Sequence, residues 1–432
     1  MKRRWFIPAA VLAAMALGLG ACGGDDGGGG TEEGDGEVTI FSLWGGSEEE
    51  AFKKVLAQFT QDTGIKTKYE AARDFLPVIR TRLNAGNPPE VGILPRPGFV
   101  DELARDDALI SLEDLGLDVD AINGNYGDTW IDLATFEDTT YGVVAKANSK
   151  STVWYKPQSF TENGFEIPET WADLEAIVKG YKDKGKTPWS VGAQGRDSSW
   201  TLTDWFEQIY VRTAGGDNYD KLFAGELAFN DATVKEALTE MVKHVNDENV
   251  LGGIDGALSL SFQDGIARVF GTNPKAEMYM LGGFVGGIAI GANPSLKPEE
   301  DIDFFPFPTI KEEHGSPLVG SGDVAAAFVN NEDVAKLIEY LSTPEAGKIW
   351  VSTGAIVSPN KGVAAGDYPN ELVGKEAEQV VNAESFRFDG SDLLPGTLGQ
   401  DFGTLLQNII KSPDEMDSLL DDYQAEAEQA FS

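Results

Sequence analysis

The sequence predicts an α/β fold made of two lobes, and three observations support that prediction. Strand-like and helix-like segments alternate over residues 38–105, which is typical of parallel strands joined by helical crossovers. The alternation starts again at residues 152–155, after a break. Strand-like segments return late, at 302–307 and 324–329, so we expect the chain to cross back from the second lobe to the first and to form a hinge.

The first lobe is expected to begin with a strand at residues 38–43. Ser47 follows, with Glu50 three residues later, and this spacing is typical of a capping box at the start of a helix. The apolar residues of that helix share one face, and they are Phe52, Val55, Leu56 and Phe59. The remaining elements expected here are strands at 65–70 and 91–94 and helices at 76–84 and 100–105.

Ligands of such sheets bind beyond the carboxyl ends of the parallel strands. In this chain those ends lead into loops at residues 44–48, 73–75 and 95–97. The loops carry aromatic and charged side chains, namely Trp44, Glu48, Asp74 and Arg96. We therefore expect a binding site at this edge of the first lobe.

The second lobe contains another capping-box pattern, formed by Thr170 and Asp173 after Pro168. Further helices are expected at 204–213, 232–248, 263–270, 333–342, 344–353, 371–383, 400–411 and 413–431. One more strand-like segment lies at 276–281. We see no short-period repeat, so two lobes are favoured over a solenoid.

The N-terminus has the pattern of an export signal. Lys2, Arg3 and Arg4 precede an apolar stretch at residues 5–19, which is too short to span a bilayer. The stretch runs into Leu19-Gly20-Ala21-Cys22, which resembles the lipobox of bacterial lipoproteins. We expect residues 1–21 to be a signal peptide and Cys22 to carry the lipid, so that the protein works outside the cytoplasm, anchored to the cell membrane. The alternative is an ordinary secreted protein.

Composition restricts the class of partner. Residues 22–36 are rich in glycine and acidic residues and are expected to form a flexible linker. A formal net charge of −37 argues against nucleic acid and anionic lipid as partners. The single cysteine leaves no disulfide, and only two histidines, His244 and His314, are present, which excludes a multi-histidine metal centre.

One motif match is misleading. Residues 180–187 fit the phosphate-loop pattern, but a helix precedes them and a strand follows, the reverse of the order that presents backbone amides to a phosphate. Gly185 is better interpreted as a helix C-cap. With 71 acidic residues, some pair of carboxylates always suits glycosidase chemistry, so that pattern says little.

Residues 37–430 resemble the extracellular solute-binding proteins of carbohydrate ABC importers, and they are most similar to the α-glucoside-binding branch. The matching segments are 146–155, 168–171, 188–189, 200–205, 320–323 and 386–395. The last is the most specific, because the unusual string Phe386-Arg-Phe-Asp-Gly-Ser-Asp-Leu-Leu-Pro395 recurs nearly whole. Two cysteines common in the branch are absent, at Ser190 and around residues 273–276, and a common glutamine is replaced around Gly282-Gly283-Phe284.

The resemblance implies a two-lobed periplasmic-binding-protein-like fold with the ligand in a cleft between the lobes. The first lobe would comprise 37–144 with a return at 306–330, and the second 145–305 and 331–432. The implied function is capture of an oligosaccharide, such as an α-linked di- or trisaccharide, for a membrane permease. The chain would act as a monomer without catalytic activity, cofactor or metal. A secreted glycosidase and a binding protein for a non-sugar solute are the alternative functions.

Trp200 is the leading candidate for a sugar platform, because it lies in a polar, loop-like segment where an indole is hard to bury. The resemblance adds hydroxyl partners, and the expected set is Trp44, Glu48, Asp74, Arg96, Lys146, Trp200, Trp205, Phe284, Asp323, Arg387 and Asp392. For each aromatic residue other than Trp200, core packing is the alternative. Asp389 and Asp392 are expected either to contact the ligand or to brace a loop.

Overall fold

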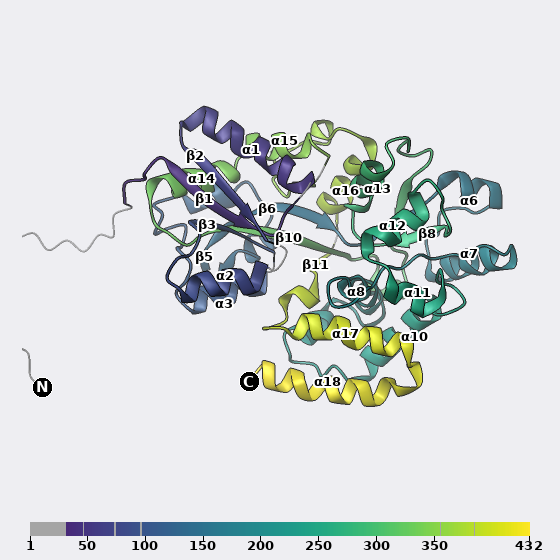
Figure 1. The fold of residues 1–432 in the computed structure, drawn as a ribbon. Helices are drawn as coiled ribbons and strands as arrows, with labels where there is room; N and C mark the ends of the chain where they lie inside the picture. Colours follow the sequence, from purple (N-terminus) through teal and green to yellow (C-terminus); the bar gives the residue numbers. More distant parts are fainter. Residues whose placement is uncertain (1–31, 46, 73–74, 96, 355, 384) are drawn as a thin grey trace, which may run out of the picture. The chain divides into compact units, whose positions relative to one another are not determined.

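A β-sheet organises each lobe of the computed structural model, which describes residues 32–432 without positions 46, 73–74, 96, 355 and 384 (Figure 1). These residues belong to one compact unit, Thr31–Ser432. The expected signal peptide, Cys22 and most of the expected linker lie outside the described residues. No helix in the described part of the chain is long and apolar enough to cross a membrane.

The sheet of the first lobe has the order β2-β1-β3-β10-β11, with β6 paired to β10. Its strands in the described residues are β1 (Glu37–Ser42), β2 (Lys66–Ala71), β3 (Val91–Leu94), β6 (Gly142–Ser149), β10 (Leu318–Ala327) and β11 (Phe386–Phe388). The expected parallel pairing is confirmed, because β1 pairs in parallel with both β2 and β3. The late strand β10 joins antiparallel to β3 and β6, so the sheet is mixed.

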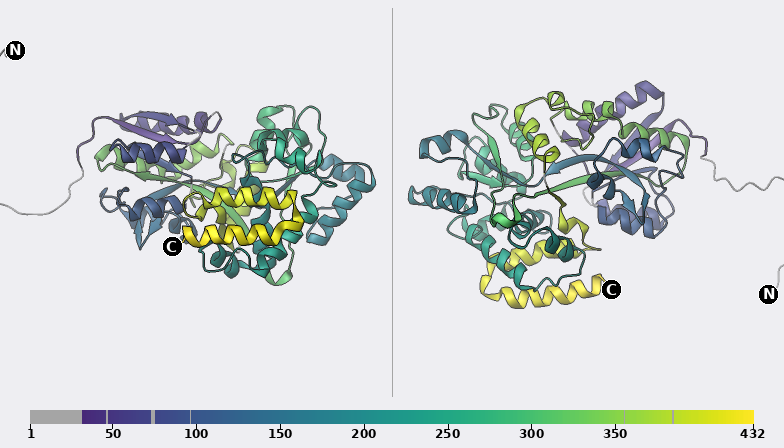
Figure 2. Two further views of the ribbon diagram at one scale, coloured as in Figure 1. Left: turned by 60° about the horizontal axis from the view of Figure 1, so that its bottom comes forward. Right: turned by 180° about the vertical axis from the view of Figure 1, so that it is seen from behind.

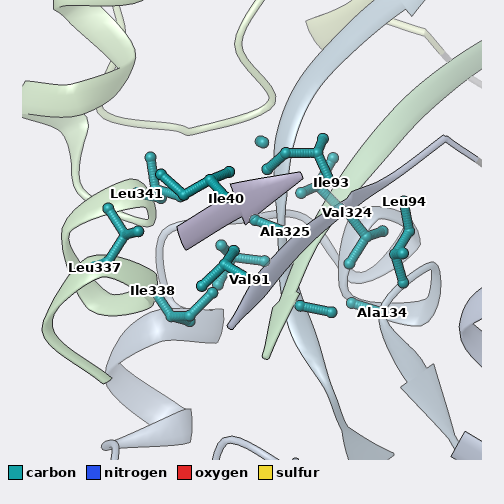
Figure 3. Packing of buried hydrophobic residues seen from close by; sticks show 14 of the residues in the cluster. Ile40, Val91, Ile93, Leu94, Ala134, Val324, Ala325, Leu337, Ile338 and Leu341 are labelled. Carbon is teal, nitrogen blue, oxygen red and sulfur yellow. The ribbon is translucent and has the colours of Figure 1, made fainter. Parts of the chain in front are cut away.

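Helices cover this sheet and bury its apolar side chains. They are α1 (Ser47–Thr63), α2 (Phe75–Asn84), α3 (Pro97–Arg105), α4 (Val119–Asn123), α5 (Asp128–Asp132), α14 (Glu332–Leu341) and α15 (Pro344–Val351). A hairpin of β4 (Thr135–Phe136) and β5 (Thr139–Thr140) lies beside them. In Figure 3, Leu337, Ile338 and Leu341 of α14 lie close to Ile40 of β1 and Val91 of β3.

The packing of α14 and α15 differs from the expected domain boundaries. The family resemblance implies that all of 331–432 belongs to the second lobe, whereas α14 and α15 bury their apolar faces in the first core. The reason is their position in the chain, because α14 follows directly from β10, which is itself a strand of the first sheet. The later helices α17 (Leu398–Lys411) and α18 (Met416–Ala430) do join the second core, where they pack side by side (Figure 2).

The second lobe is built on a smaller antiparallel sheet. Its described strands have the order β8 (Met278–Met280), β7 (Thr152–Tyr155) and β9 (Asp303–Pro306). The helices around it are α6 (Pro157–Asn163), α7 (Trp171–Asp183), α8 (Trp200–Ala214), α9 (Gly216–Phe223), α10 (Ala232–His244), α11 (Gly253–Ser259), α12 (Phe262–Phe270) and α13 (Val285–Ala292). The strand-like segment at 302–307 therefore belongs to the second lobe, since β9 pairs with β7, and within the expected return at 306–330 it is β10 that joins the first sheet.

Local signals in the second lobe behave as the sequence predicts. Thr170 and Asp173 form a reciprocal capping box at the start of α7. Gly185 follows the end of α7 with a φ of 71°, in the left-handed region that glycine favours. The phosphate-loop look-alike is thus the end of a helix.

Within the described residues, the chain passes between the lobes three times, through crossing segments 150–151, 307–317 and 389–397. The first joins β6 to β7, the second joins β9 to β10, and the third joins β11 to α17. Helix α16 (Glu371–Val381) lies against the same region and contributes buried side chains to the cores of both lobes. Several connections of this kind favour a hinge over a loose tether.

The last residues of the expected linker are held against the first lobe. The backbone N–H of Gly36 donates to the Asp333 carboxylate at 2.8 Å, and the N–H of Glu332 donates to the carbonyl of Glu32 at 2.9 Å. The chain is therefore already docked on the start of α14 at residues 32–36, although the sequence pattern predicts a flexible linker up to residue 36.

Candidate functional site

The candidate site is organised by β6, the strand that enters the first crossing segment. Alternate residues of an extended chain share a face, and this places Lys146, Asn148 and Lys150 in one row. Asp323 of β10 stands directly opposite Lys146 in the antiparallel pairing. Each lysine of the row is the centre of a separate cluster of side chains.

The Lys146 centre consists of Trp44, Glu48, Lys146 and Asp323. The Lys146 ammonium donates to Glu48 Oε1 at 2.6 Å and lies 3.3 Å from Asp323 Oδ2. Trp44 Nε1–H donates to the same Asp323 oxygen at 2.6 Å, and the ammonium stands 4.9 Å from the centre of the Trp44 ring. The loop after β1, the start of α1 and the hinge strands β6 and β10 therefore meet at one point.

Burial and charge work against each other in the Lys146 centre. Burial alone would lower the pKa of Lys146, but the carboxylates of Asp323 and Glu48 hold it above its ordinary value. Burial raises the pKa of Asp323, and the nearby Lys146 ammonium only partly opposes that rise. The centre remains open at one edge, since the Glu48 side chain is 41% exposed.

The Lys150 centre consists of Lys150, Trp200, Asp204 and Asp389. The Lys150 ammonium lies 2.9 Å from Asp204 Oδ1 on α8 and 2.8 Å from Asp389 Oδ2 after β11. It also stands 4.8 Å from the centre of the Trp200 ring. The two carboxylates are almost fully buried, with side-chain exposures of 1% for Asp204 and 3% for Asp389.

The two carboxyl groups of the Lys150 centre differ in charge. Burial raises the pKa of Asp204 to about 8, although Lys150 opposes the rise. Burial acts to raise the pKa of Asp389 as well. Lys150 and the Ser391 hydroxyl, which donates to Asp389 at 2.9 Å, nevertheless keep that pKa below the ordinary value. One ammonium thus neutralises one carboxylate, Asp389, while Asp204 holds a proton at neutral pH.

Aromatic rings extend from the Lys150 centre. Trp200 is the first residue of α8 and is half-buried. Its ring centre lies 5.1 Å from that of Phe262 and 6.0 Å from that of Phe284. Its indole N–H donates to the carbonyl of Asp197 at 3.1 Å, which fixes the orientation of the ring.

A cavity of about 270 Å³ lies beside this aromatic group. Its walls come from β6, from α13 in the second lobe, and from α16 and the segment after α15. The side chains with polar atoms in its lining are Asn148, Trp154, Thr353, Asn370 and Glu376, and its apolar wall includes Phe284 and Leu372. Asn148 belongs both to the cavity lining and to the lysine row, and Phe284 belongs to the lining and packs on Trp200, so these features are neighbours.

The structure brings together six of the expected site residues around this site, namely Trp44, Glu48, Lys146, Asp323, Trp200 and Phe284. Asp74 and Arg96 lie outside the described residues. Asp392 is half-buried on the short 3₁₀ turn Gly390–Leu393 that follows β11.

Trp205 and Arg387 take other positions. The Trp205 ring is buried in the second core, where it packs edge-on against Trp189 at 5.0 Å, so its burial argues against contact with a ligand. The Arg387 guanidinium pairs with Asp220 of α9 at 2.7 Å, which joins the third crossing region to the second lobe. Both residues therefore stand apart from the cavity and the lysine row.

The residues of the site that are absent from the set expected from sequence include Asn148, Lys150, Asp204 and Glu376. The sequence does carry a signal for Asn148 and Lys150, since they continue the alternation that starts at Lys146. Asp204 stands beside Trp205 in a segment that is notable for its aromatic residues. Glu376 lies on a helix with no sequence signal beyond its own charge.

The two lobes, their crossing segments and the cavity against the hinge strands define a periplasmic-binding-protein fold. The solved structure of the bacterial solute receptor AcbH has this fold, with a TM-score of 0.80 and 20% identity over 92% of this chain and 100% of that chain. AcbH itself has an exclusive substrate preference for β-D-galactopyranose.

The chain belongs to the bacterial extracellular solute-binding proteins, a family that matches residues 45–348. The osmoprotective compounds-binding protein GgtB of Synechocystis is 35% identical over 84% of this chain and 86% of its own length. The α-glucosides-binding periplasmic protein AglE of Rhizobium meliloti is 35% identical over 84% of this chain and 80% of its own length. Membership makes this chain a solute-binding protein and sets the enzyme alternative aside.

Proposed function

We propose that this chain is the carbohydrate-binding component of an ABC importer and that its ligand is a small α-glucoside. The cavity beside β6 carries the proposal, because it combines an aromatic wall with hydrogen-bonding side chains. A sugar ring offers an apolar C–H face that packs on an aromatic ring, and its hydroxyls need polar partners. Phe284 supplies the first kind of surface, and Asn148 and Glu376 supply the second.

The open edge of the Lys146 centre adds a further hydroxyl partner. Glu48 is held by Lys146 but is 41% exposed, so one part of its carboxylate faces solvent. A ligand hydroxyl that donates to this carboxylate would share it with the ammonium without leaving either charge unpaired. The name of AglE, for α-glucosides, supports a sugar ligand, whereas the name of GgtB, for osmoprotective compounds, leaves a non-sugar solute as the alternative.

The size of the cavity favours a short ligand. Typical ligand pockets measure about 300–1,000 Å³, and the cavity here, at about 270 Å³, lies just below that range. We therefore favour a mono- or disaccharide over a trisaccharide.

A thermal-shift screen tests the proposed function, because a ligand that binds the native state raises the melting temperature. The panel contains α- and β-linked disaccharides, hexoses, trisaccharides and a non-sugar osmoprotectant such as betaine. We expect a stabilising hit among the hexoses and the α-linked disaccharides, followed by a measurable Kd in calorimetry. A response to betaine alone would favour the non-sugar alternative, and no response to any sugar would refute the proposal.

The lipid anchor at Cys22 and the partnership with a permease are part of the same proposal. Cys22 is the sole cysteine and ends an apolar, small-residue run. We expect Cys22→Ala to leave an uncleaved precursor or to release the protein from the membrane fraction. Unchanged processing and unchanged detergent partitioning would contradict the anchor.

A further inference from the structure

Glu376 is a buried acid in the wall of the cavity. It lies on α16 with 4% of its surface exposed. Its Oε1 accepts a hydrogen bond from the backbone N–H of Ser149, the last residue of β6, at 3.0 Å. The carboxyl group therefore stands at the end of the lysine row, where the hinge strand leaves the first lobe.

Gly283 provides the space that the Glu376 carboxyl occupies. A Cβ atom at Gly283 would lie 1.8 Å from Glu376 Cδ and 1.9 and 2.1 Å from its two oxygens. No side chain fits there while Glu376 keeps its position. The Gly283 N–H also donates to the carbonyl of Ser149 at 2.8 Å. Ser149 therefore bonds to both Gly283 and Glu376 and fixes their relative positions.

The surroundings of Glu376 determine its chemistry. Burial raises its pKa to about 8, and the hydrogen bond from Ser149 only partly opposes that rise. At neutral pH the group is therefore a carboxylic acid, which offers one hydrogen-bond donor and further acceptor capacity. The same cavity wall carries Phe284 and Leu372, and a low-polarity wall makes an unmatched ligand hydroxyl costly.

We propose that Glu376 is a specificity-determining residue, whose carboxyl recognises a hydroxyl of the ligand in the cavity, and that Gly283 is the position that admits it. This inference rests on the proposed function, because it names a contact within the same sugar site. A hydroxyl that both donates to and accepts from this group is distinguished from a hydrogen or a methyl at the same carbon.

Three variants separate this role from a structural one. Glu376→Gln keeps a donor and an acceptor and should bind the sugar found in the screen within about threefold of the wild type. Glu376→Ala should lose about tenfold in affinity, as expected for one hydrogen bond. Gly283→Ala leaves Glu376 in the chain but displaces its carboxyl, so it should lose about as much affinity as Glu376→Ala.

The matched control is Gly374→Ala. Gly374 lies on α16, close to Glu376 in sequence, but a Cβ there meets no atom within 4 Å. This variant should bind like the wild type. Thermal melts of all four variants without ligand establish that each is folded at the temperature of the calorimetry.

Monodeoxy analogues of the ligand give a second readout that does not depend on stability. The wild type should discriminate against the analogue that lacks the recognised hydroxyl by about tenfold, and Glu376→Ala should discriminate against it hardly at all. Discrimination at the other positions should survive. If sugar binds but no deoxy position is coupled to Glu376, this inference is refuted and the proposed function stands. If no sugar binds the wild type, the proposed function itself fails.

Discussion

The Lys146 and Lys150 centres have similar compositions but differ in their exposure to solvent. The two lysines lie four residues apart on one strand and its exit. Each ammonium stands between two carboxylates and at nearly the same distance from an indole ring, 4.9 Å for Trp44 and 4.8 Å for Trp200. Yet Glu48 in the first centre is 41% exposed, whereas Asp204 in the second is 1% exposed. The exposed Lys146–Glu48 pair is accessible to a ligand, whereas the buried Lys150–Asp204 contact is not and instead stabilises the fold.

The Lys150 centre, through Asp204, is part of a longer polar face on α8. Glu207 accepts the backbone N–H groups of Gly390 and Ser391 in the third crossing segment, at 2.9 and 3.0 Å. Gln208 accepts the hydroxyl of Ser151 in the first crossing segment at 2.8 Å. Arg212 donates to the carbonyl of Pro317 in the second crossing segment at 2.8 Å.

Helix α8 therefore contacts each of these crossing segments. The same helix begins with Trp200, beside the cavity. A ligand that presses on the Trp200 ring thus acts on the helix that fixes the hinge. The two centres thus differ along one strand, because the Lys146 centre is open to solvent and the Lys150 centre is continuous with the contacts of α8 to the crossing segments.

The largest effect is expected from Lys150→Met. This change leaves the Asp389 carboxylate buried without its cation, which costs about 3–5 kcal/mol when a buried pair is broken. Lys146→Met should cost less stability, because Glu48 can turn to solvent, but it should weaken ligand binding more. Urea unfolding and calorimetry on both variants check the comparison. Equal stability losses would show that exposure does not separate the two centres.

Much of the fold could be predicted from sequence, and the exceptions have physical reasons. Strands β1, β3 and β7 and helices α7 and α12 follow from alternation, capping and apolar faces. Helix α13 does not, because its sequence Val-Gly-Gly-Ile-Ala-Ile-Gly-Ala carries three glycines, which are poor helix formers. The position of α14 depends on where β10 pairs, and pairing between distant strands leaves no local signal.

The site was predicted less well than the fold. A lysine is almost never fully buried unless it is paired, so the alternation that Lys150 continues from Lys146 does not mark it as internal until Asp204 and Asp389 are known to be close. Those partners lie 54 and 239 positions further along the chain. Trp205 illustrates the converse, since polar neighbours in sequence did not prevent its ring from facing the core.

Trp200→Ala tests whether the Trp200 ring of the Lys150 centre contacts the ligand. One face of the indole is occupied by the Lys150 ammonium, so a sugar can stack only on what remains. Loss of about 100 Å² of apolar contact corresponds to about 2.5 kcal/mol, or about a 60-fold weaker Kd. Trp205→Ala is the matched core control and should instead lose about 3–5 kcal/mol of stability. Calorimetry and thermal melting on both variants distinguish the roles, and preserved affinity in Trp200→Ala would make that residue a packing residue.

The dependence of stability on pH tests whether Asp204 in the Lys150 centre is protonated. Because the pKa of Asp204 is about 8 in the folded protein and about 4 when unfolded, the folded state binds more protons between these values. The free energy of unfolding should therefore fall as pH rises through this window, by up to about 1.4 kcal/mol per pH unit for such a group. Asp204→Asn removes that contribution and should flatten the profile. Asp323→Asn in the open centre should flatten it less, because Trp44 and Lys146 both stabilise the charged form of Asp323. An unchanged slope in Asp204→Asn would place the proton elsewhere.

The smallest effect is expected from Lys186→Ala, a lysine outside the row on β6. Lys186 belongs to the segment that imitates a phosphate loop, but in the structure it is 35% exposed and lies 3.5 Å from Glu277. The Glu277 side chain is only 11% exposed, but it keeps a second cation, Lys156, at 3.0 Å, so the loss of Lys186 leaves its carboxylate paired. We therefore expect ligand affinity to stay within about twofold of the wild type and the melting temperature to change little. If Lys186→Ala weakened sugar binding as much as Lys146→Met, a lysine outside the row on β6 would matter as much as one within it. The proposed role of the Lys146 centre in binding would then be refuted.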